Sequence, residues 1–440
     1  MKKVKLLIVL VLIAAIIAAF IILPGCKNTP ATTTAAETTT AAETTAAVDL
    51  GPIHALIYSW YTLKEEHIKE FTKSTGIEVQ AELISYEDMT TKIATSSAAN
   101  VCPGDVIGVW GITLASEVPS GFVEPLDAYI SDELKKDLIG ITAYEFNGKT
   151  YGVPANLDLL GLGVNNEMLE KASITSIPQT MDELSQACFA IKNAGVIDYP
   201  LLLALTADGG TPTRWYLLTL AYGGKLFDEN YQPLFTTEGS AGYKALEFMI
   251  GNIGKIIDPI MIETTAGDAD SAFLAGQGAF AFTPLAKLSS KKEDPEQSKI
   301  VGKASIELVP GSEEFRSACI DFFSDGFAIS SLSQHKEAAW KFIEWWLSPE
   351  NIANAYAEAG LGPARSSVLN ELTDKGVLKD GKKIMEQGSY SRSIFTVGIP
   401  SWFEEWESNA ANVINQAARG QITFNEALQN MADKAVELQK

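Results

Sequence analysis

The pattern of apolar and polar positions divides the start of the globular part of the chain into short elements. Residues 53–58 form an apolar run, and residues 77–83 alternate apolar with polar positions, as strands do. Between them, residues 64–74 have helical spacing, and Gly76 follows where a left-handed residue commonly ends a helix. Strand, helix and strand in this order predict a parallel pair with a right-handed crossover, and therefore an α/β fold.

Similar patterns continue along the chain. Residues 105–110 (DVIGVW) predict the next strand. Thr180 and Glu183 fit a capping box at the start of a helix. Another helix is expected to begin at Pro349 and to stop at Gly360. No repeat of fixed period interrupts this order.

The chain begins with a basic and then strongly apolar segment. Three lysines lead into 18 apolar residues, from Leu6 to Leu23, a length between that of a secretory signal and that of a membrane-spanning helix. The run ends at Leu23-Pro24-Gly25-Cys26, which resembles the lipobox of bacterial lipoproteins, although the proline departs from the usual small or apolar residue. The resemblance implies that residues 1–25 are a signal peptide and that Cys26 is lipidated.

An uncleaved anchor helix is the alternative for this segment. In both cases the basic flank stays inside, so the rest of the chain is expected outside the cytoplasm, held at the membrane. Residues 26–48 consist mainly of threonine and alanine and lack large apolar side chains from residue 29 to residue 47. Such a tract cannot bury enough surface to order itself, so it predicts a flexible tether.

The charge and length of the remaining chain limit what it can be. The formal charge is −21, and removal of Lys2, Lys3 and Lys5 with the signal peptide makes it −24. A body this acidic repels nucleic acid, so we expect no nucleic-acid partner. The nearly 400 residues after the tether are too many for a single hydrophobic core, so we expect two lobes.

Motifs of catalysis, cofactor binding and metal binding are absent from the sequence. It contains no GxSxG, GxxxxGK[ST], HExxH or CxxC motif, so we expect no cofactor and no metal site. Histidines and cysteines lie too far apart in sequence for a local site: His54, His67, His335, Cys102, Cys188 and Cys319. The many carboxylates leave a glycosidase pair open.

Aromatic residues follow several predicted strands. Trp60 and Tyr61 end the first strand, Trp110 ends residues 105–110, Phe282 ends another apolar run, and Trp402 begins a helix. Ligands of open α/β sheets bind beyond the carboxyl ends of the strands. Flat aromatic faces can stack on the C–H face of a sugar ring, so these positions favour a sugar-binding crevice.

Several segments in order along the chain resemble extracellular solute-binding proteins of ABC importers, and most of all the subgroup for maltose and other sugars. These segments include GFVEPLDAYI, FNGKTYGVPANLDLLGLGVNNEMLEKASI, FLAGQGAFAF, HKEAAWKFIEWWLSPE and LGPARSS. The resemblance implies the two-lobed periplasmic-binding-protein fold of type II, with α/β lobes that are discontinuous in sequence and close about a hinge. It implies a first lobe of residues 49–157 and 325–368, and a second of residues 158–324 and 369–440.

The resemblance also implies which residues contact the ligand. Trp110 and Trp402 match aromatic platforms, and Asp158 matches a hinge carboxylate that bonds sugar hydroxyls. At Phe282 the chain departs from the family pattern, because Thr283-Pro284 follows it. The full set of expected ligand-binding residues is Ser59, Trp60, Tyr61, Trp110, Asn156, Asp158, Arg214, Trp215, Phe282, Asp325, Arg365 and Trp402.

The sequence thus predicts a monomeric, lipid-anchored receptor that captures a sugar or oligosaccharide and passes it to the permease of an ABC importer. It would bind without catalysis. Three alternatives stay open at this point: the same fold with another solute such as a polyamine or a phosphoester, a surface glycoside hydrolase, and a receptor read by a sensor domain.

Overall fold

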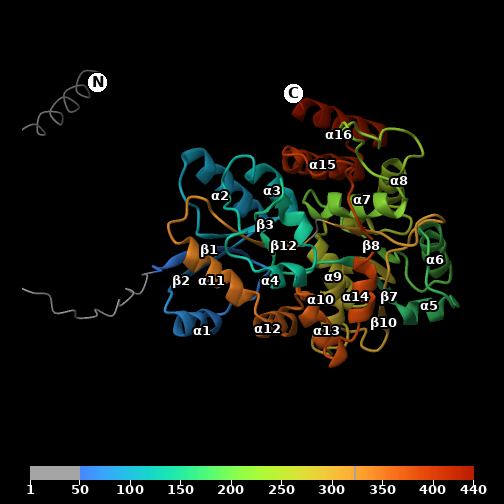
Figure 1. Ribbon diagram of the computed structural model, residues 1–440. Coiled ribbons are helices and arrows are strands. Elements are labelled where there is room, and N and C mark those ends of the chain that lie inside the picture. Colours follow the sequence, from blue (N-terminus) through green and yellow to red (C-terminus); the bar gives the residue numbers. More distant parts are fainter. Residues whose placement is uncertain (1–49, 322–323) are drawn as a thin grey trace, which may run out of the picture. The chain divides into compact units, whose positions relative to one another are not determined.

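The computed structural model describes residues 50–321 and 324–440 (Figure 1). The expected signal peptide, Cys26 and the tether lie outside these described residues. No helix within the described part of the chain is both long and apolar enough to cross a bilayer.

Five strands from distant parts of the chain form the first sheet, in the order β2-β1-β3-β12-β6. Strand β1 is parallel to both of its neighbours, and Ile53 of β1 lies opposite Val79 of β2. This confirms the predicted strand, helix, strand unit. Strand β12 runs antiparallel to β3 and places Asp325 opposite Trp110. The strands are β1 (Ile53–Tyr58), β2 (Val79–Ile84), β3 (Val106–Trp110), β6 (Val153–Pro154) and β12 (Asp325–Ile329).

Helices pack against this sheet and complete the first lobe. Phe71 of α1 and Phe342 of α11 meet edge to face at 5.4 Å between ring centroids, and Trp346 packs against Phe327 of β12. The remaining elements of this part are α1 (Glu65–Thr75), α2 (Tyr86–Ala99), α3 (Gly111–Glu117), α4 (Asp132–Asp137), η1 (Ile141–Tyr144), β4 (Glu145–Phe146), β5 (Lys149–Thr150) and α11 (Lys336–Trp346).

A second sheet, ordered β10-β7-β9-β8, forms the centre of the second lobe. Its core includes Trp215 of α7 and Trp406 of α15, both fully buried. The strands are β7 (Leu160–Asn165), β8 (Leu201–Leu202), β9 (Phe280–Pro284) and β10 (Ala304–Glu307), with β11 (Cys319–Ile320) and β13 (Ser391–Arg392) paired beside them.

The helices around the second sheet come from two separate stretches of chain, residues 166–291 and 349–438. They are α5 (Asn166–Lys171), α6 (Met181–Asn193), α7 (Gly210–Ala221), α8 (Ala241–Gly251), η2 (Pro259–Glu263), α9 (Ala266–Leu274), α10 (Leu285–Lys291), α12 (Pro349–Ala359), α13 (Ser366–Asp374), α14 (Gly381–Gly388), α15 (Phe403–Ala418) and α16 (Phe424–Leu438).

Helix boundaries follow the local signals in the sequence. The Thr180 side chain accepts a hydrogen bond from the Glu183 backbone amide at the start of α6, which is one half of the predicted capping box. The Glu183 carboxylate accepts from the Gln179 backbone amide and not from that of Thr180. Gly76 and Gly360 end α1 and α12 in the left-handed conformation, with φ of 75° and 74°.

The chain crosses between the lobes after β6 and returns at β12. The lobe boundaries taken from the resemblance stay a prediction, and the packing of two helices differs from them. Tyr356 of α12 and Val368 of α13 are buried in the second core, although residues 325–368 were assigned to the first lobe. These helices face the second sheet because α12 packs against α10.

Gly326 offers a test of how tightly the returning strand is packed. A Cβ atom there would lie 2.1 Å from the Val153 carbonyl oxygen and 2.9 Å from the Tyr144 hydroxyl. We expect Gly326→Ala to lower the free energy of unfolding by about 1–3 kcal/mol, because β6 and β12 would have to move apart.

The measurement is urea unfolding followed by circular dichroism. Gly251→Ala is the matched control, because nothing lies within 4 Å of the added Cβ. Equal stability of the two variants would contradict the close packing of β6 on β12.

Candidate ligand-binding site

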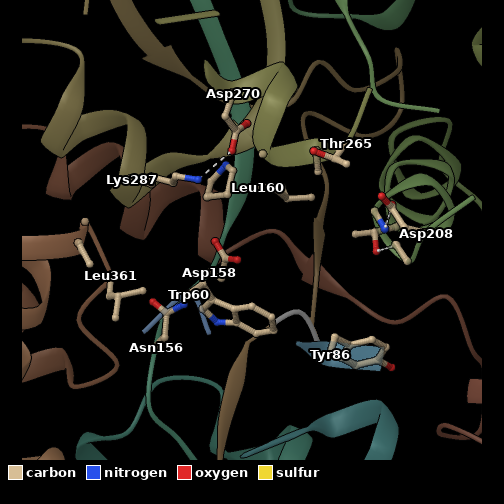
Figure 2. A pocket seen from close by; sticks show the side chains of 18 of the residues that line it. Trp60, Tyr86, Asn156, Asp158, Leu160, Asp208, Thr265, Asp270, Lys287 and Leu361 are labelled. Atoms are coloured by element: carbon tan, nitrogen blue, oxygen red, sulfur yellow. Dashed lines mark hydrogen bonds and ion pairs between the residues drawn. The ribbon is translucent and has the colours of Figure 1, made fainter. Parts of the chain in front are cut away.

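A cavity of about 640 Å³ lies between the two sheets and draws residues from both lobes and from the crossing segment (Figure 2). Trp60, Tyr86 and Trp110 line it from the first lobe. Asn156 and Asp158 line it from the segment between β6 and β7. The volume is within the range of small-molecule sites.

Three aromatic rings form the wall on the side of the first lobe. Trp60 and Tyr86 lie just beyond the carboxyl ends of β1 and β2, and Trp110 is the last residue of β3, where a parallel sheet places its ligand-binding residues. The ring centroids of Trp60 and Trp110 are 6.2 Å apart, with an angle of 82° between the ring planes. The ring centroids of Tyr86 and Trp110 are 6.0 Å apart, with an angle of 73°. Trp60 also stacks on Tyr58 at 4.3 Å, and 39% of its surface is exposed. The wall therefore offers aromatic surface to a ligand.

A buried hydrogen-bond network fixes this wall to the crossing segments. The Trp60 indole N–H donates to one oxygen of the Asp325 carboxylate, and the Asn156 amide donates to the other at 3.1 Å. The Asn156 side-chain oxygen in turn accepts from the Gly362 backbone amide at 2.8 Å. Burial raises the pKa of Asp325, and these hydrogen bonds oppose that rise.

Charged side chains line the opposite side of the cavity. Asp270 of α9 forms an ion pair of 3.4 Å with Lys287 of α10, and Figure 2 shows both above Asp158. The second oxygen of Asp270, Oδ1, is buried and has no hydrogen-bond partner among the described residues. Arg214 donates to the Phe282 carbonyl oxygen at 3.3 Å. A ligand hydroxyl at Oδ1 of Asp270 would supply the missing hydrogen bond.

Asp158 is a second acceptor at the centre of the cavity. Burial raises the pKa of its carboxyl to about 7, and the nearby charge of Asp325 adds to this rise. Its carboxylate makes no hydrogen bond to any part of the chain that the structure describes. The backbone N–H of Asp158 donates a hydrogen bond to Ser324 Oγ at 3.4 Å. Carboxyl groups of this kind bind the hydroxyls of an uncharged polar solute.

Five of the residues expected from the sequence line this cavity. They are Trp60, Trp110, Asn156, Asp158 and Arg214. Asp325 lies directly behind Trp60 and holds it, so it contributes by positioning.

Three other expected residues are buried in the lobe cores and do not line the cavity. Trp215 is enclosed in the second core and donates its indole N–H to the Gly242 carbonyl at 2.8 Å. Phe282 is buried in β9 and only its carbonyl oxygen faces Arg214. Tyr61 packs between Phe327 and Trp346.

The last three expected residues lie at the surface or against other elements. Ser59 is exposed beside the end of β1. Arg365 pairs with Asp137 at 2.8 Å and donates to the Leu347 carbonyl, a contact between helices. The ring of Trp402 packs against Phe227 at 5.7 Å and does not line the cavity.

Sequence reasoning missed Tyr86, Asp208, Asp270, Lys287 and Glu407, which also line the cavity. Tyr86 could have been found, because it follows the predicted strand at residues 77–83 as Trp60 follows the first. The others lie on helices or loops whose distance from the crossing strands no local pattern reveals. No group of histidine, cysteine and acidic side chains within residues 50–321 and 324–440 is arranged to hold a metal ion.

The contrast between Trp60 and Trp215 provides a direct test of the site. We expect Trp60→Ala to cost about 1–3 kcal/mol of stability, because it removes one hydrogen-bond donor from the buried Asp325 carboxylate, and to weaken ligand binding about tenfold or more, as for other aromatic anchors. We expect Trp215→Ala to cost about 3–5 kcal/mol of stability, because it empties a core position.

Calorimetric melting and titration with the ligand measure both effects on the same samples. A large loss of stability in Trp60→Ala with unchanged affinity would place Trp60 in the fold and not in the site.

Comparisons with known proteins agree with this architecture. Residues 66–384 match the profile of the family described as bacterial extracellular solute-binding protein. A putative binding protein of Brucella abortus is 26% identical over 288 residues, which cover 64% of this chain and 67% of the relative. A probable amino-acid ABC transporter periplasmic-binding protein of Sinorhizobium fredii is 23% identical over 315 residues, 69% of each chain.

Solved structures share the fold at low sequence identity. Maltose-bound MalE3 of T. maritima superposes with a TM-score of 0.78 at 21% identity, over 88% of this chain and all of the other. A solute-binding protein of Agrobacterium vitis with bound D-mannitol gives 0.76 at 19% identity, over 88% and 98% of the two chains. The fold is therefore the predicted two-lobed one. Since the family profile spans well over half of its length, the chain belongs to the bacterial extracellular solute-binding proteins.

Proposed function

We propose that this protein is a receptor that captures a neutral sugar, a sugar oligomer or a polyol between its lobes and delivers it to an ABC importer. The observation that carries the proposal is the composition of the cavity. Aromatic faces of Trp60, Tyr86 and Trp110 lie across from the hydroxyl acceptors Asp158 and Asp270. A sugar ring presents C–H faces to the first wall and hydroxyls to the second.

The charges of the second wall support an uncharged ligand. Lys287 is paired with Asp270, and the Arg214 guanidinium is close enough to Asp158, Asp208 and Asp270 to interact with their charges. Two of the three cations that line the cavity, Lys287 and Arg214, thus already have acidic protein partners, whereas Lys291 forms no ion pair among the described residues. The carboxylates of Asp158, Asp208 and Asp270 on the same wall disfavour a phosphorylated or otherwise anionic solute. The similar solved structures include proteins with bound maltose and with bound D-mannitol, which belong to the same chemical class.

The mechanism follows from the position of the cavity. A solute that contacts both walls binds more tightly when the lobes are close together than when they are apart. This difference in affinity shifts the protein toward the closed arrangement. The closed form would be presented to the permease, and reopening there would release the solute. The protein would bind its ligand without turnover, as a receptor and not as a glycoside hydrolase.

Thermal unfolding of residues 49–440 with a panel of sugars tests the proposal. A ligand present at a thousand times its Kd stabilises the folded state by about 4 kcal/mol, so the melting temperature should rise with one member of the panel. The panel contains maltose, maltotriose, mannitol and ribitol, with spermidine, glycerol phosphate and an amino-acid mixture as controls for other solutes.

Variants connect such a rise to the cavity. Trp110→Ala and Asp158→Ala should abolish it, whereas Glu229→Ala, on an exposed turn that does not line the cavity, should retain it. A rise with a control solute alone would overturn the sugar assignment. Release of a product from an oligosaccharide would overturn the assignment as a receptor.

The proposal includes a lipid anchor at Cys26, on the sequence Leu23-Pro24-Gly25-Cys26. We expect the full-length protein to incorporate labelled palmitate in bacterial cells and to stay with the membrane fraction. Cys26→Ser should incorporate no label, and Cys102→Ser is the matched control. Equal labelling of the Cys26 variant would contradict lipidation at this residue.

A further inference from the structure

Three glutamates meet where the two lobes touch beside the cavity. Glu117 ends α3 of the first lobe, and Glu404 and Glu407 lie in the first turns of α15 of the second lobe. Helices α3 and α15 pack against each other, as Figure 1 shows. Glu117 and Glu407 are each only 6% exposed, so the contact removes their carboxyl groups from water.

One hydroxyl group lies near each carboxyl. The Thr113 hydroxyl of α3 and the Tyr216 hydroxyl of α7 are close enough to oppose the rise in the pKa of Glu117 and of Glu407, respectively. The Thr90 hydroxyl of α2, in the first lobe, lies close enough to Glu404 to oppose the rise of its pKa. One oxygen of Glu117 and one of Glu404 are buried without any hydrogen-bond partner in the described part of the chain.

No positive charge compensates this cluster within residues 50–321 and 324–440. None of the three glutamates forms an ion pair with a lysine, arginine or histidine there. The titratable groups that face them from α2, α7 and β1 are the tyrosines Tyr86, Tyr216 and Tyr58. The neighbouring Glu405 differs, because it points outward and pairs with Lys434 at 2.7 Å.

Burial without a cation favours the neutral form of each carboxyl. Burial, with a further contribution from the charge of Glu404, raises the pKa of Glu117 and of Glu407 to about 8. Burial also raises the pKa of Glu404. If the lobes separated, water would reach Glu117 and Glu404, and their pKa values would move back toward the ordinary value of a glutamate.

We propose that Glu117, Glu404 and Glu407 form a proton-dependent latch between the lobes, which holds α3 against α15 when the carboxyls are protonated and releases them when they ionise. Glu407 also lines the cavity, but Glu117 and Glu404, which meet across the contact of the lobes, do not. The latch therefore concerns the approach of the lobes and does not depend on which solute the cavity binds.

The direction of the pH dependence follows from proton linkage. The closed arrangement has the higher pKa values, so it binds more protons than the open arrangement. The free-energy advantage that protonation gives to the closed arrangement is complete below the ordinary glutamate pKa of about 4.5. This advantage is lost as the pH rises through about 8. Each carboxyl that titrates changes the equilibrium by up to about tenfold per pH unit in this window.

Small-angle X-ray scattering of residues 49–440 without sugar tests the latch from pH 5 to pH 9. The body from Leu50 to Lys440 forms one compact unit that contains both cores. We expect the radius of gyration of the wild-type protein to increase as the pH rises. The double variant Glu117→Gln/Glu404→Gln should stay compact over the whole range, because glutamine mimics the protonated acid.

Glu405→Gln is the matched control on the same helix and should behave like the wild type. Circular dichroism melting verifies that each variant is folded. If the double variant does not fold, the single variants Glu117→Gln and Glu404→Gln are measured in its place. A radius that does not change with pH in the wild type would overturn the latch. The same change in the double variant would overturn it too.

Because this experiment contains no sugar, its result is independent of the sugar panel. A chain that binds no sugar can still show the pH-dependent expansion, and a sugar receptor can lack it.

Discussion

The buried carboxylate of Asp325 connects the fold to the cavity. It lies at the start of the strand by which the chain returns to the first sheet, and it accepts hydrogen bonds from Trp60 and Asn156. A buried carboxylate without such donors would be costly, so the structure needs both partners in place. Asn156 also holds Gly362, so one network orders an aromatic wall and two crossing segments.

The two walls of the cavity differ in chemistry because they come from different kinds of element. The ends of parallel strands supply the aromatic rings of the first lobe, whereas helices α9 and α10 supply Asp270 and Lys287 in the second. Neither lobe alone can satisfy a ligand that has both apolar faces and hydroxyls. Capture therefore requires that the lobes approach, and the same approach buries Glu117 against α15.

The sequence predicted the parts of this arrangement that depend on local pattern. Strand ends located Trp60 and Trp110, and the family resemblance located Asn156 and Asp158. The sequence did not separate Trp215 from these residues, because every residue from Thr211 to Ala221 in α7 is buried, so no exposed face of the helix distinguishes its core side from its cavity side. Asp270 and Glu407 come to the cavity only through packing between elements far apart in the chain, which a single sequence does not encode as a local signal.

Hydrogen–deuterium exchange of residues 49–440, with and without the sugar that most raises the melting temperature, tests the bridging of the lobes most directly. We expect slower exchange on both sides of the cavity, in the Trp60 loop of the first lobe and in α9 and α10 of the second. Protection confined to one lobe, or at a surface away from the cavity, would contradict capture between the lobes.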